Sequence, residues 1–241
     1  MSKTITPYNT TETKKHQVQT MFDNIAPRYD LLNRLLSFGV DSYWRKIAIQ
    51  TLKKYNPKHI LDIACGTGDF SFAAMELNPD KITGVDISDE MLEVGRKKIA
   101  QKKLSPAMEF LKGDSEDLEF KDHTFDAVTV AFGVRNFEEL DKGLQEMHRV
   151  LKENKPVVIL EFSKPAAFPV KQLFNFYFKA ICPVVGRLVS KDARAYTYLY
   201  ESVSAFPDGE NFLQHLRKAG FKNTRCRRLT FGICSLYTAE K

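Results

Sequence analysis

Short apolar runs alternate with longer amphipathic stretches through the middle of the chain. The apolar runs predict five buried strands, over residues 60–64, 81–85, 108–111, 125–132 and 156–162. Apolar residues at helical spacing predict helices between several of these strands, over residues 70–77, 89–102 and 138–151. Strands that alternate with helices form right-handed crossovers and a parallel sheet, so the pattern predicts an α/β fold.

The two ends of the chain carry different patterns. Residues 12–24 predict a helix, and polar side chains at Tyr29, Asp30, Asn33 and Ser37 then recur three or four positions apart. On a helix these four share one face, which suits a surface helix and a cap over a pocket equally well.

Near the other end, residues 208–220 predict a helix. Residues 222–230 and 231–238 then predict two strands joined by a tight turn near Gly232. The chain is therefore expected to end in a β-hairpin.

Polar side chains follow each of the five predicted strands. They are Asp62 to Gly68, Asp86, Asp114 with Ser115, Arg135 with Asn136, and Glu161. Ligands of parallel sheets bind outside the carboxyl ends of the strands. Each cluster alone would serve as a helix cap or turn, but five at successive strand ends predict a binding site.

The first of these clusters contains a glycine-rich turn, Gly66-Thr67-Gly68, where a ligand can approach the bare backbone. The dinucleotide fingerprint G-x-G-x-x-G would need glycine at Ser71. Carboxylates instead flank the turn, at Asp62 and Asp69, which suits a cationic ligand better than a pyrophosphate. The loop resembles the S-adenosylmethionine loop of Rossmann-like methyltransferases.

Asp86, at the end of the second strand, suits the two hydroxyls of a ribose. NAD and S-adenosylmethionine both contain a ribose, so Asp86 does not discriminate between them. Asp114 and Ser115 are positioned to meet an adenine edge.

Composition excludes few classes of protein or partner. The chain has 241 residues, 43% of them hydrophobic, which one domain can use to bury a substantial core. A net charge of +6 allows nucleic acid or anionic lipid as a partner. The four cysteines form no C-x-x-C pair, which favours reduced thiols and no metal site. With no apparent signal peptide and no apolar run of membrane-spanning length, a cytoplasmic protein is expected.

The chain resembles the menaquinone/ubiquinone biosynthesis C-methyltransferases from about Phe22 to its end. The segments that carry the resemblance are Tyr29–Asn33 with Ser37 and Trp44, Phe132–Asn136, Arg149–Lys152, Leu160–Pro165, and Tyr198–Ser202 with Phe206 and Pro207. The sequence departs from the family pattern at Asp41, where the family usually has His, and at Ala131, where Ser is common. It also has Glu153-Asn154-Lys155 where the family usually has Pro-Gly-Gly.

The resemblance implies a seven-stranded, Rossmann-like methyltransferase fold. The sheet is expected to be mostly parallel, with a C-terminal antiparallel hairpin and an N-terminal helical cap. Within one domain, 1–241, the expected parts are a cap over 12–56, a cofactor-binding core over 57–165, a substrate lid over 166–206, and a helix with the hairpin over 207–241.

The implied activity is S-adenosylmethionine-dependent C-methylation of a prenylated quinol, chiefly demethylmenaquinol. A benzoquinol of ubiquinone biosynthesis and a nucleotide-dependent oxidoreductase remain alternatives. By resemblance, Thr67, Asp86, Asp114 and Ser115 contact the cofactor. The loop argument adds Asp62, Gly66 and Gly68.

A quinol ring attacks best as its phenolate, which needs a nearby cation or base because a phenol has a pKa of about 10. Arg135 is the expected cation, since guanidinium stays charged. Asn136 and Tyr29 are expected to complete the catalytic set. No metal is needed, because the sulfonium is already a good leaving group. The proton acceptor remains open.

Residues 168–200 mix aromatic, aliphatic and basic side chains. They fit either a helix packed on the sheet or an amphipathic lid that touches anionic lipid through Phe174 and Phe178. The expected partners are a prenylated quinol and, transiently, the inner face of the plasma membrane. Nucleic acid is not expected. The oligomeric state, monomer or homodimer, remains open.

Overall fold

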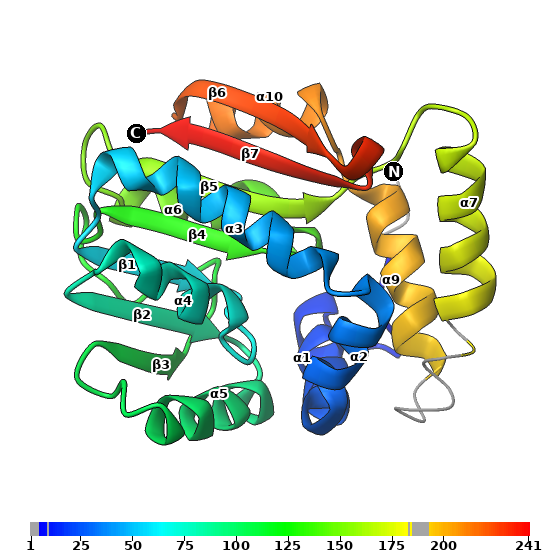
Figure 1. Ribbon diagram of the computed structural model, residues 1–241, viewed down its shortest axis with the longest axis horizontal. Coiled ribbons are helices and arrows are strands. Elements are labelled where there is room, and N and C mark those ends of the chain that lie inside the picture. Colours follow the sequence, from blue (N-terminus) through cyan, green and yellow to red (C-terminus); the bar gives the residue numbers. More distant parts are fainter. Residues whose placement is uncertain (1–4, 9, 183, 185–192) are drawn as a thin grey trace.

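A seven-stranded sheet runs through the computed structural model of the protein, which describes residues 5–8, 10–182, 184 and 193–241 (Figure 1). Its strand order is β3-β2-β1-β4-β5-β7-β6. The parallel strands are β1 (His59–Ile63), β2 (Lys81–Asp86), β3 (Met108–Lys112), β4 (Ala127–Ala131) and β5 (Pro156–Phe162). β7 (Cys234–Glu240) pairs antiparallel with both β5 and β6 (Lys222–Leu229). The predicted α/β fold and terminal hairpin are therefore confirmed.

Two of the differences from the predicted strand bounds have local reasons. The fourth strand is shorter than 125–132, because Phe125 meets Leu151 only in an isolated bridge. The hairpin turn, η6 (Thr230–Gly232), occupies residues expected in strands. Phe231 and Gly232 both have positive φ, a conformation that an extended strand does not contain.

Helices precede the sheet and fill most of its connections. The N-terminal ones are α1 (Lys14–Ile25), η1 (Ala26–Arg28), α2 (Tyr29–Ser37), α3 (Val40–Leu52) and η2 (Lys53–Tyr55). Those within the alternating region are α4 (Asp69–Ala74), η3 (Met75–Leu77), α5 (Asp89–Gln101), η4 (Val134–Asn136) and α6 (Leu140–Val150). After β5 come α7 (Val170–Phe176), η5 (Tyr177–Ile181), α9 (Ala193–Ala205) and α10 (Glu210–Lys218).

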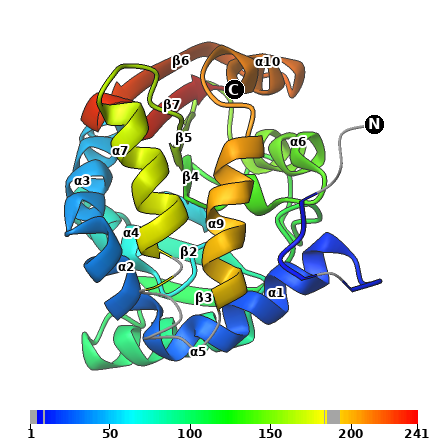
Figure 2. The same ribbon diagram turned by 90° about the vertical axis from the view of Figure 1, so that its right-hand side faces the viewer.

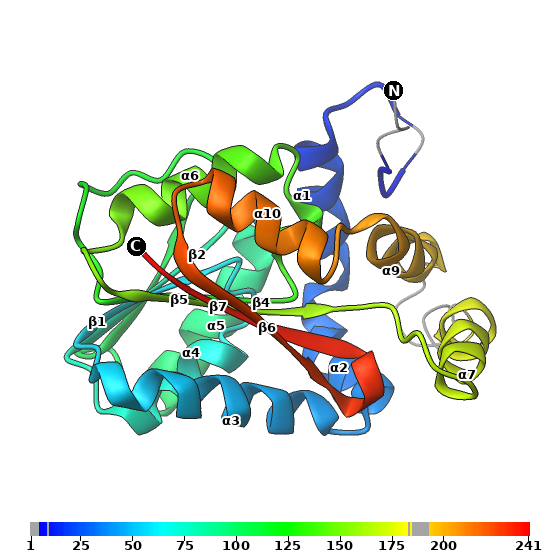
Figure 3. The same ribbon diagram turned by 90° about the horizontal axis from the view of Figure 1, so that it is seen from above.

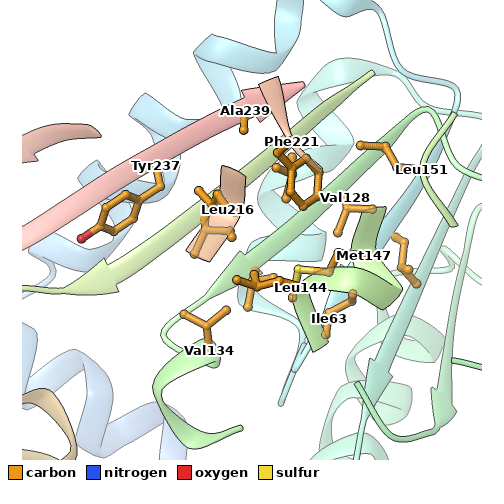
Figure 4. Packing of buried hydrophobic residues seen from close by; sticks show 14 of the residues in the cluster. Ile63, Val128, Val134, Leu144, Met147, Leu151, Leu216, Phe221, Tyr237 and Ala239 are labelled. Carbon is orange, nitrogen blue, oxygen red and sulfur yellow. The ribbon is translucent and has the colours of Figure 1, made fainter. Parts of the chain in front are cut away.

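Helices cover both faces of the sheet (Figure 3). α6 and α10 lie on one face, where Leu144, Met147 and Leu216 pack against Val128 and the other strand residues of the first core (Figure 4). α3, α4 and α5 lie on the other face, where the second core gathers. A sheet buried on both faces explains why its central strands read as continuous apolar runs.

The remaining helices lie beyond the carboxyl ends of the parallel strands, where ligands are expected (Figure 1). Figure 2 shows α1, α2, α7 and α9 on this side of the molecule. α1, α2 and α9 share a third apolar core, and α7, η5 and α9 share a fourth. These two cores form the walls of the site described below.

Of the two alternatives for Phe174 and Phe178, a packed core and a lipid contact, the structure shows the core. Both rings are buried in the fourth core with Cys182 and Val203, and their centroids lie 4.4 Å apart. They pack on α9 because this helix supplies an apolar face that the sequence pattern of residues 168–182 alone does not reveal. Other members of the expected lid, at 185, 187–189 and 191, lie outside the described residues.

Candidate active site

The glycine-rich loop after β1 is held by Asp86 at the end of β2. The Gly66 amide donates to Asp86 Oδ2 at 2.8 Å, and the Ser88 amide donates to Oδ1 at 2.9 Å. Burial raises the pKa of Asp86, and these two hydrogen bonds partly oppose it. Gly68 has a φ of 92°, and a Cβ there would stand 2.3 Å from the Phe110 ring. Glycine is therefore required at 68 both for its backbone conformation and for lack of space.

A small pocket of about 80 Å³ opens between this loop, β4 and α1. Gly66, Asp86, Asp114, Ser115 and Asn136 from the predicted set line it. The Asn136 Oδ1 atom is buried there and has no hydrogen-bond partner among the described residues. An unpaired buried acceptor beside two carboxylates and exposed loop backbone fits a ligand that carries donors, such as a ribose and an adenine amine.

Lys15 of α1 already contacts one acceptor of this pocket. Its Nζ atom lies 2.5 Å from Asp114 Oδ2 and 2.9 Å from Glu116 Oε2. Its neighbour Lys14 donates to the Phe137 carbonyl at 2.6 Å. The N-terminal turn of α1 is thereby bound across the edge of the small pocket.

The other three predicted cofactor residues do not line the small pocket. Asp62 is buried between Ser71 Oγ, at 2.5 Å, and Thr129 Oγ1, at 2.8 Å. Its burial raises its pKa to about 6. Thr67 donates to Asp30 Oδ1 at 2.6 Å, which ties the loop to α2. Asp62, Thr67 and Gly68 therefore contribute to the conformation of the loop and not to the lining of the small pocket.

A large cavity of about 530 Å³ lies between the α1–α3 region and the α7–α9 region. Its lining is mainly aliphatic and aromatic and comes from α1, α2, α3, α7, η5, α9 and η6. Phe22, Tyr29 and Phe132 line both the large cavity and the small pocket. A ligand in one space is therefore adjacent to a ligand in the other at these three side chains.

Arg135 lines the large cavity with its guanidinium almost fully buried. Its Nη1 atom donates to Glu161 Oε1 at 2.9 Å and also to the Phe132 carbonyl. Its Nε atom is buried and has no partner among the described residues. The charged side chain is thus fixed by Glu161 and retains one donor for a ligand.

Two tyrosines add donors to this cavity. Burial raises the pKa of Tyr29, with Asn33, Arg135 and Arg45 opposing it in part. Burial also raises the pKa of Tyr198, whose hydroxyl has no partner among the described residues. Both hydroxyls therefore stay protonated at neutral pH and can donate.

The remaining predicted members divide between the two spaces. Asn136 belongs to the small pocket, whereas Asn33 and Ser37 line the large cavity. Asp30 lines neither and forms an ion pair with Lys98 at 2.6 Å.

The site contains polar residues to which sequence reasoning gave no role. Tyr198, Asp41 and Arg45 all line the large cavity. Tyr198 belongs to a segment that resembles the family, and Arg45 follows Trp44 of another, but spacing along the chain gave no sign that α3 and α9 meet the same cavity.

Within the described ranges, no three His, Cys, Asp or Glu side chains are grouped to hold a metal ion. In the same ranges, no helix combines the length and apolar character needed to cross a bilayer.

The fold and the small pocket define the class of S-adenosylmethionine-dependent methyltransferases. Among solved structures, the chain is similar to such a methyltransferase from Thermotoga maritima, described as a possible histamine N-methyltransferase. The TM-score is 0.65 at 18% identity, over 92% of this chain and 99% of that one. At this identity the likeness concerns the fold.

The chain belongs to the ubiE/COQ5 methyltransferase family, whose model matches residues 10–241. It is 51% identical to a demethylmenaquinone methyltransferase of Bacteroides fragilis, over 98% of this chain and 97% of that protein. It is 45% identical to a ubiquinone/menaquinone biosynthesis C-methyltransferase of Geotalea daltonii, over 95% and 97%. The chain is therefore a methyltransferase that uses S-adenosylmethionine, as the sequence predicts.

Proposed function

We propose that the protein methylates a ring carbon of a prenylated quinol, converting demethylmenaquinol to menaquinol. The observation that carries the proposal is Arg135, a fixed and buried cation with a free donor, on the wall of a large apolar cavity that adjoins the cofactor pocket. An apolar cavity with few polar groups suits an aromatic ring with a hydrocarbon tail.

The residues that line the small pocket support the proposal that it binds S-adenosylmethionine. Asp86 would accept from the ribose hydroxyls, while Asp114, Ser115 and Asn136 would meet the adenine. When bound, S-adenosylmethionine supplies a methyl group on a positively charged sulfur. The protein's own contribution is to align the acceptor carbon with that methyl group and to exclude water.

The donors of the large cavity support attack by a quinol. Electron density on the ring carbon rises as the neighbouring hydroxyl loses its proton. Arg135 would donate to the resulting oxyanion, and the protonated hydroxyls of Tyr29 and Tyr198 are close enough to the cavity to assist. These donors are fixed before the reaction, which is what makes such stabilisation effective.

The naphthoquinol is preferred because the Bacteroides fragilis relative is named for demethylmenaquinone and is the more similar of the two relatives. The Geotalea daltonii name covers ubiquinone as well, so a benzoquinol is the second candidate.

The test is an anaerobic assay with prenylated naphthoquinone and benzoquinone, each with and without dithionite, followed by mass spectrometry. We expect methyl transfer to the reduced naphthoquinol. Equal turnover of quinone and quinol would refute a quinol mechanism.

Arg135→Lys tests the residue itself. Lysine keeps the charge but lacks the planar fork. We expect kcat to fall about 100-fold, as for loss of one fixed donor, with unchanged affinity for S-adenosylhomocysteine. Arg149→Lys is the matched control, because Arg149 binds Glu146 and Asp122 and lines neither space. If Arg135→Lys keeps the wild-type kcat, the role of Arg135 is structural and the proposed stabilisation of the oxyanion is wrong.

We also propose that the mouth of the large cavity touches the bilayer that holds a prenylated substrate. Phe38, Leu173 and Phe231 line the cavity and are 80%, 63% and 82% exposed. Three large apolar side chains from separate segments, exposed at one opening, are costly in water and favourable in lipid. Lys171 and Lys179 on the same segment as Leu173 would each add about 1 kcal/mol near anionic lipid.

Vesicle flotation tests this contact. Phe231→Ser should reduce binding to vesicles of anionic phospholipid without lowering the melting temperature. Leu111→Ser is the control, since Leu111 is exposed on β3 at the other edge of the sheet. Equal flotation of both variants and wild type would contradict the proposal.

A further inference from the structure

Arg45 reaches the large cavity from α3 with part of its guanidinium unpaired. Its Nη1 atom pairs with Asp41, and its Nη2 atom lies 3.7 Å from Asp69 Oδ2. Its Nε atom is buried and, within the described chain, has no hydrogen-bond partner. The side chain is only 10% exposed. Because an unpaired buried donor raises the free energy of the fold, a ligand oxygen in the cavity would relieve that cost.

Asp41 fixes this guanidinium in place. Its carboxylate also accepts a hydrogen bond from Ser37 Oγ at 2.5 Å. Burial acts to raise the pKa of Asp41, but the Ser37 hydrogen bond and the Arg45 charge outweigh it and hold the pKa below its usual value. The carboxylate is therefore ionised, and Arg45 is held by a charged partner.

An aromatic wall forms part of the lining of the large cavity, which Arg45 and Arg135 also line. It consists of Trp44, Phe132 and Phe162, whose ring centroids lie 4.7 to 6.1 Å apart. Arg135 Cζ lies 5.7 Å from the Phe162 centroid. Arg45 and Arg135 line the same cavity as these three rings, so a flat ring bound against this wall shares the cavity with both guanidinium groups.

The two arginines differ in their relation to the small pocket. Arg135 precedes Asn136, which lines that pocket, and lies on the same 3-10 turn. Both arginines line the large cavity, and neither lines the small pocket. Arg135 is joined to the small pocket through its own turn, η4, whereas Arg45 reaches the large cavity from α3, so the oxyanion beside the methyl donor is assigned to Arg135.

We propose that Arg45, positioned by Asp41, binds the second oxygen of the substrate, the one para to the oxygen that Arg135 stabilises. This inference rests on the proposed quinol substrate. Arg45 then makes the enzyme select rings with two para hydroxyls. A ring with one hydroxyl leaves a buried guanidinium nitrogen unpaired, which is the strongest form of discrimination a polar site offers.

The experiment compares two substrates in four proteins. The substrates are a prenylated 1,4-naphthoquinol and the matching prenylated 1-naphthol, which keeps the acceptor carbon and its neighbouring hydroxyl but lacks the para hydroxyl. The proteins are wild type, Arg45→Met, the double variant Asp41→Asn with Arg45→Met, and Lys46→Met. The double variant removes both charges, so that no carboxylate is buried alone. Lys46 is the control, exposed on the same helix.

Wild type should prefer the quinol by about 10- to 100-fold in kcat/KM, the effect of a charged hydrogen bond. The preference should fall below about threefold in both Arg45 variants and should be unchanged in Lys46→Met. A purely structural role would lower both rates together and leave their ratio intact. A retained preference in either folded Arg45 variant overturns the inference.

If the proposed quinol methylation is wrong, the outcome differs from the one expected if only the role of Arg45 is wrong. If wild type methylates neither ring, the same ratio is measured as dissociation constants, from quenching of Trp44, the sole tryptophan in the sequence. A binding preference that disappears with Arg45 still supports the second oxygen site. No binding of either ring overturns both proposals, whereas turnover with an unchanged ratio overturns this one alone.

Discussion

The small pocket and the large cavity adjoin at three side chains, yet they are built in opposite ways. Strand-end loops and the start of α1 surround the small pocket, and its lining is rich in polar groups, from the carboxylates of Asp86 and Asp114 to the side chains of Lys15, Ser115 and Asn136. Helices from both ends of the chain surround the large cavity, and its polar groups are a few side chains among hydrocarbon. A site of the first kind depends on the sheet, and one of the second kind depends on how helices pack together.

Because of this difference, substitutions in the two regions should affect different properties of the protein. Changes in helix packing should affect the large cavity and global stability, whereas changes at strand ends should affect cofactor affinity. The following four changes test that separation.

Phe178→Ala should have the largest effect on stability. Phe178 is buried between Phe162, Phe174 and Tyr177, so its removal should cost about 3–5 kcal/mol of unfolding free energy. Phe176→Ala, on the same segment but 63% exposed, should cost about 0.5 kcal/mol or less. Urea denaturation measures both. Similar losses in the two variants would contradict the assignment of Phe178 to the core.

Asp62 should make the stability of the sheet pH-dependent. Burial raises its pKa to about 6, so the folded state binds its proton more tightly than the unfolded state does. Its contribution to the free energy of unfolding is therefore fully present below about pH 4 and falls as the pH rises through 6. The loss amounts to about 3 kcal/mol, at 1.36 kcal/mol for each pKa unit.

Comparison with Asp62→Asn isolates this contribution. The difference in unfolding free energy, wild type minus variant, should decline between pH 4 and 7. A constant difference over that range would mean that the Asp62 carboxyl does not titrate there.

Asp86→Ala should weaken S-adenosylhomocysteine binding by about 1.5–3 kcal/mol, the value of a charged hydrogen bond. Asp89→Ala is the control, because Asp89 lies three residues along and pairs on the surface with Lys112. Calorimetry gives both affinities. Unchanged affinity in a folded Asp86 variant would mean that Asp86 does not contact the cofactor.

Lys15→Met should have the smallest effect. The Lys15–Asp114 pair is partly exposed, so its removal should change stability by about 1 kcal/mol or less, and less at high salt. If the cofactor and Lys15 compete for Asp114, the variant should bind S-adenosylhomocysteine up to about fivefold tighter. Binding weakened more than tenfold would mean that Lys15 contacts the cofactor itself.

The same contrast explains what the sequence could predict. Strands, strand-end loops and the small pocket follow from local patterns: Asp86 and Asp114 lie where parallel strands end, and all such ends meet at one edge. Ser88, two residues after the end of β2, caps α5, and its Oγ atom accepts a hydrogen bond from the Met91 amide at 3.2 Å.

The large cavity was less predictable because its residues come together only in the tertiary structure. Arg45 and Tyr198 lie far apart in sequence, and nothing local indicates that both line one cavity. Phe174 and Phe178 fit a lipid face and a core equally well until α9 is placed beside them. The Asp62 carboxylate accepts hydrogen bonds from Ser71 and Thr129, and the distance between these positions in sequence gives no sign of either contact.

One hydrogen bond also sets an order of assembly. Trp44 Nε1 donates to Thr230 Oγ1 at 2.7 Å, across 186 positions of sequence. During synthesis α3 leaves the ribosome long before residue 230. The Trp44 indole therefore lacks its Thr230 partner, and this side of the cavity is incomplete, until the final hairpin has been synthesised. The five parallel strands, whose ends surround the small pocket, are complete by residue 162. A growing chain can therefore form the small pocket before the large cavity, whose lining includes residues 230–233.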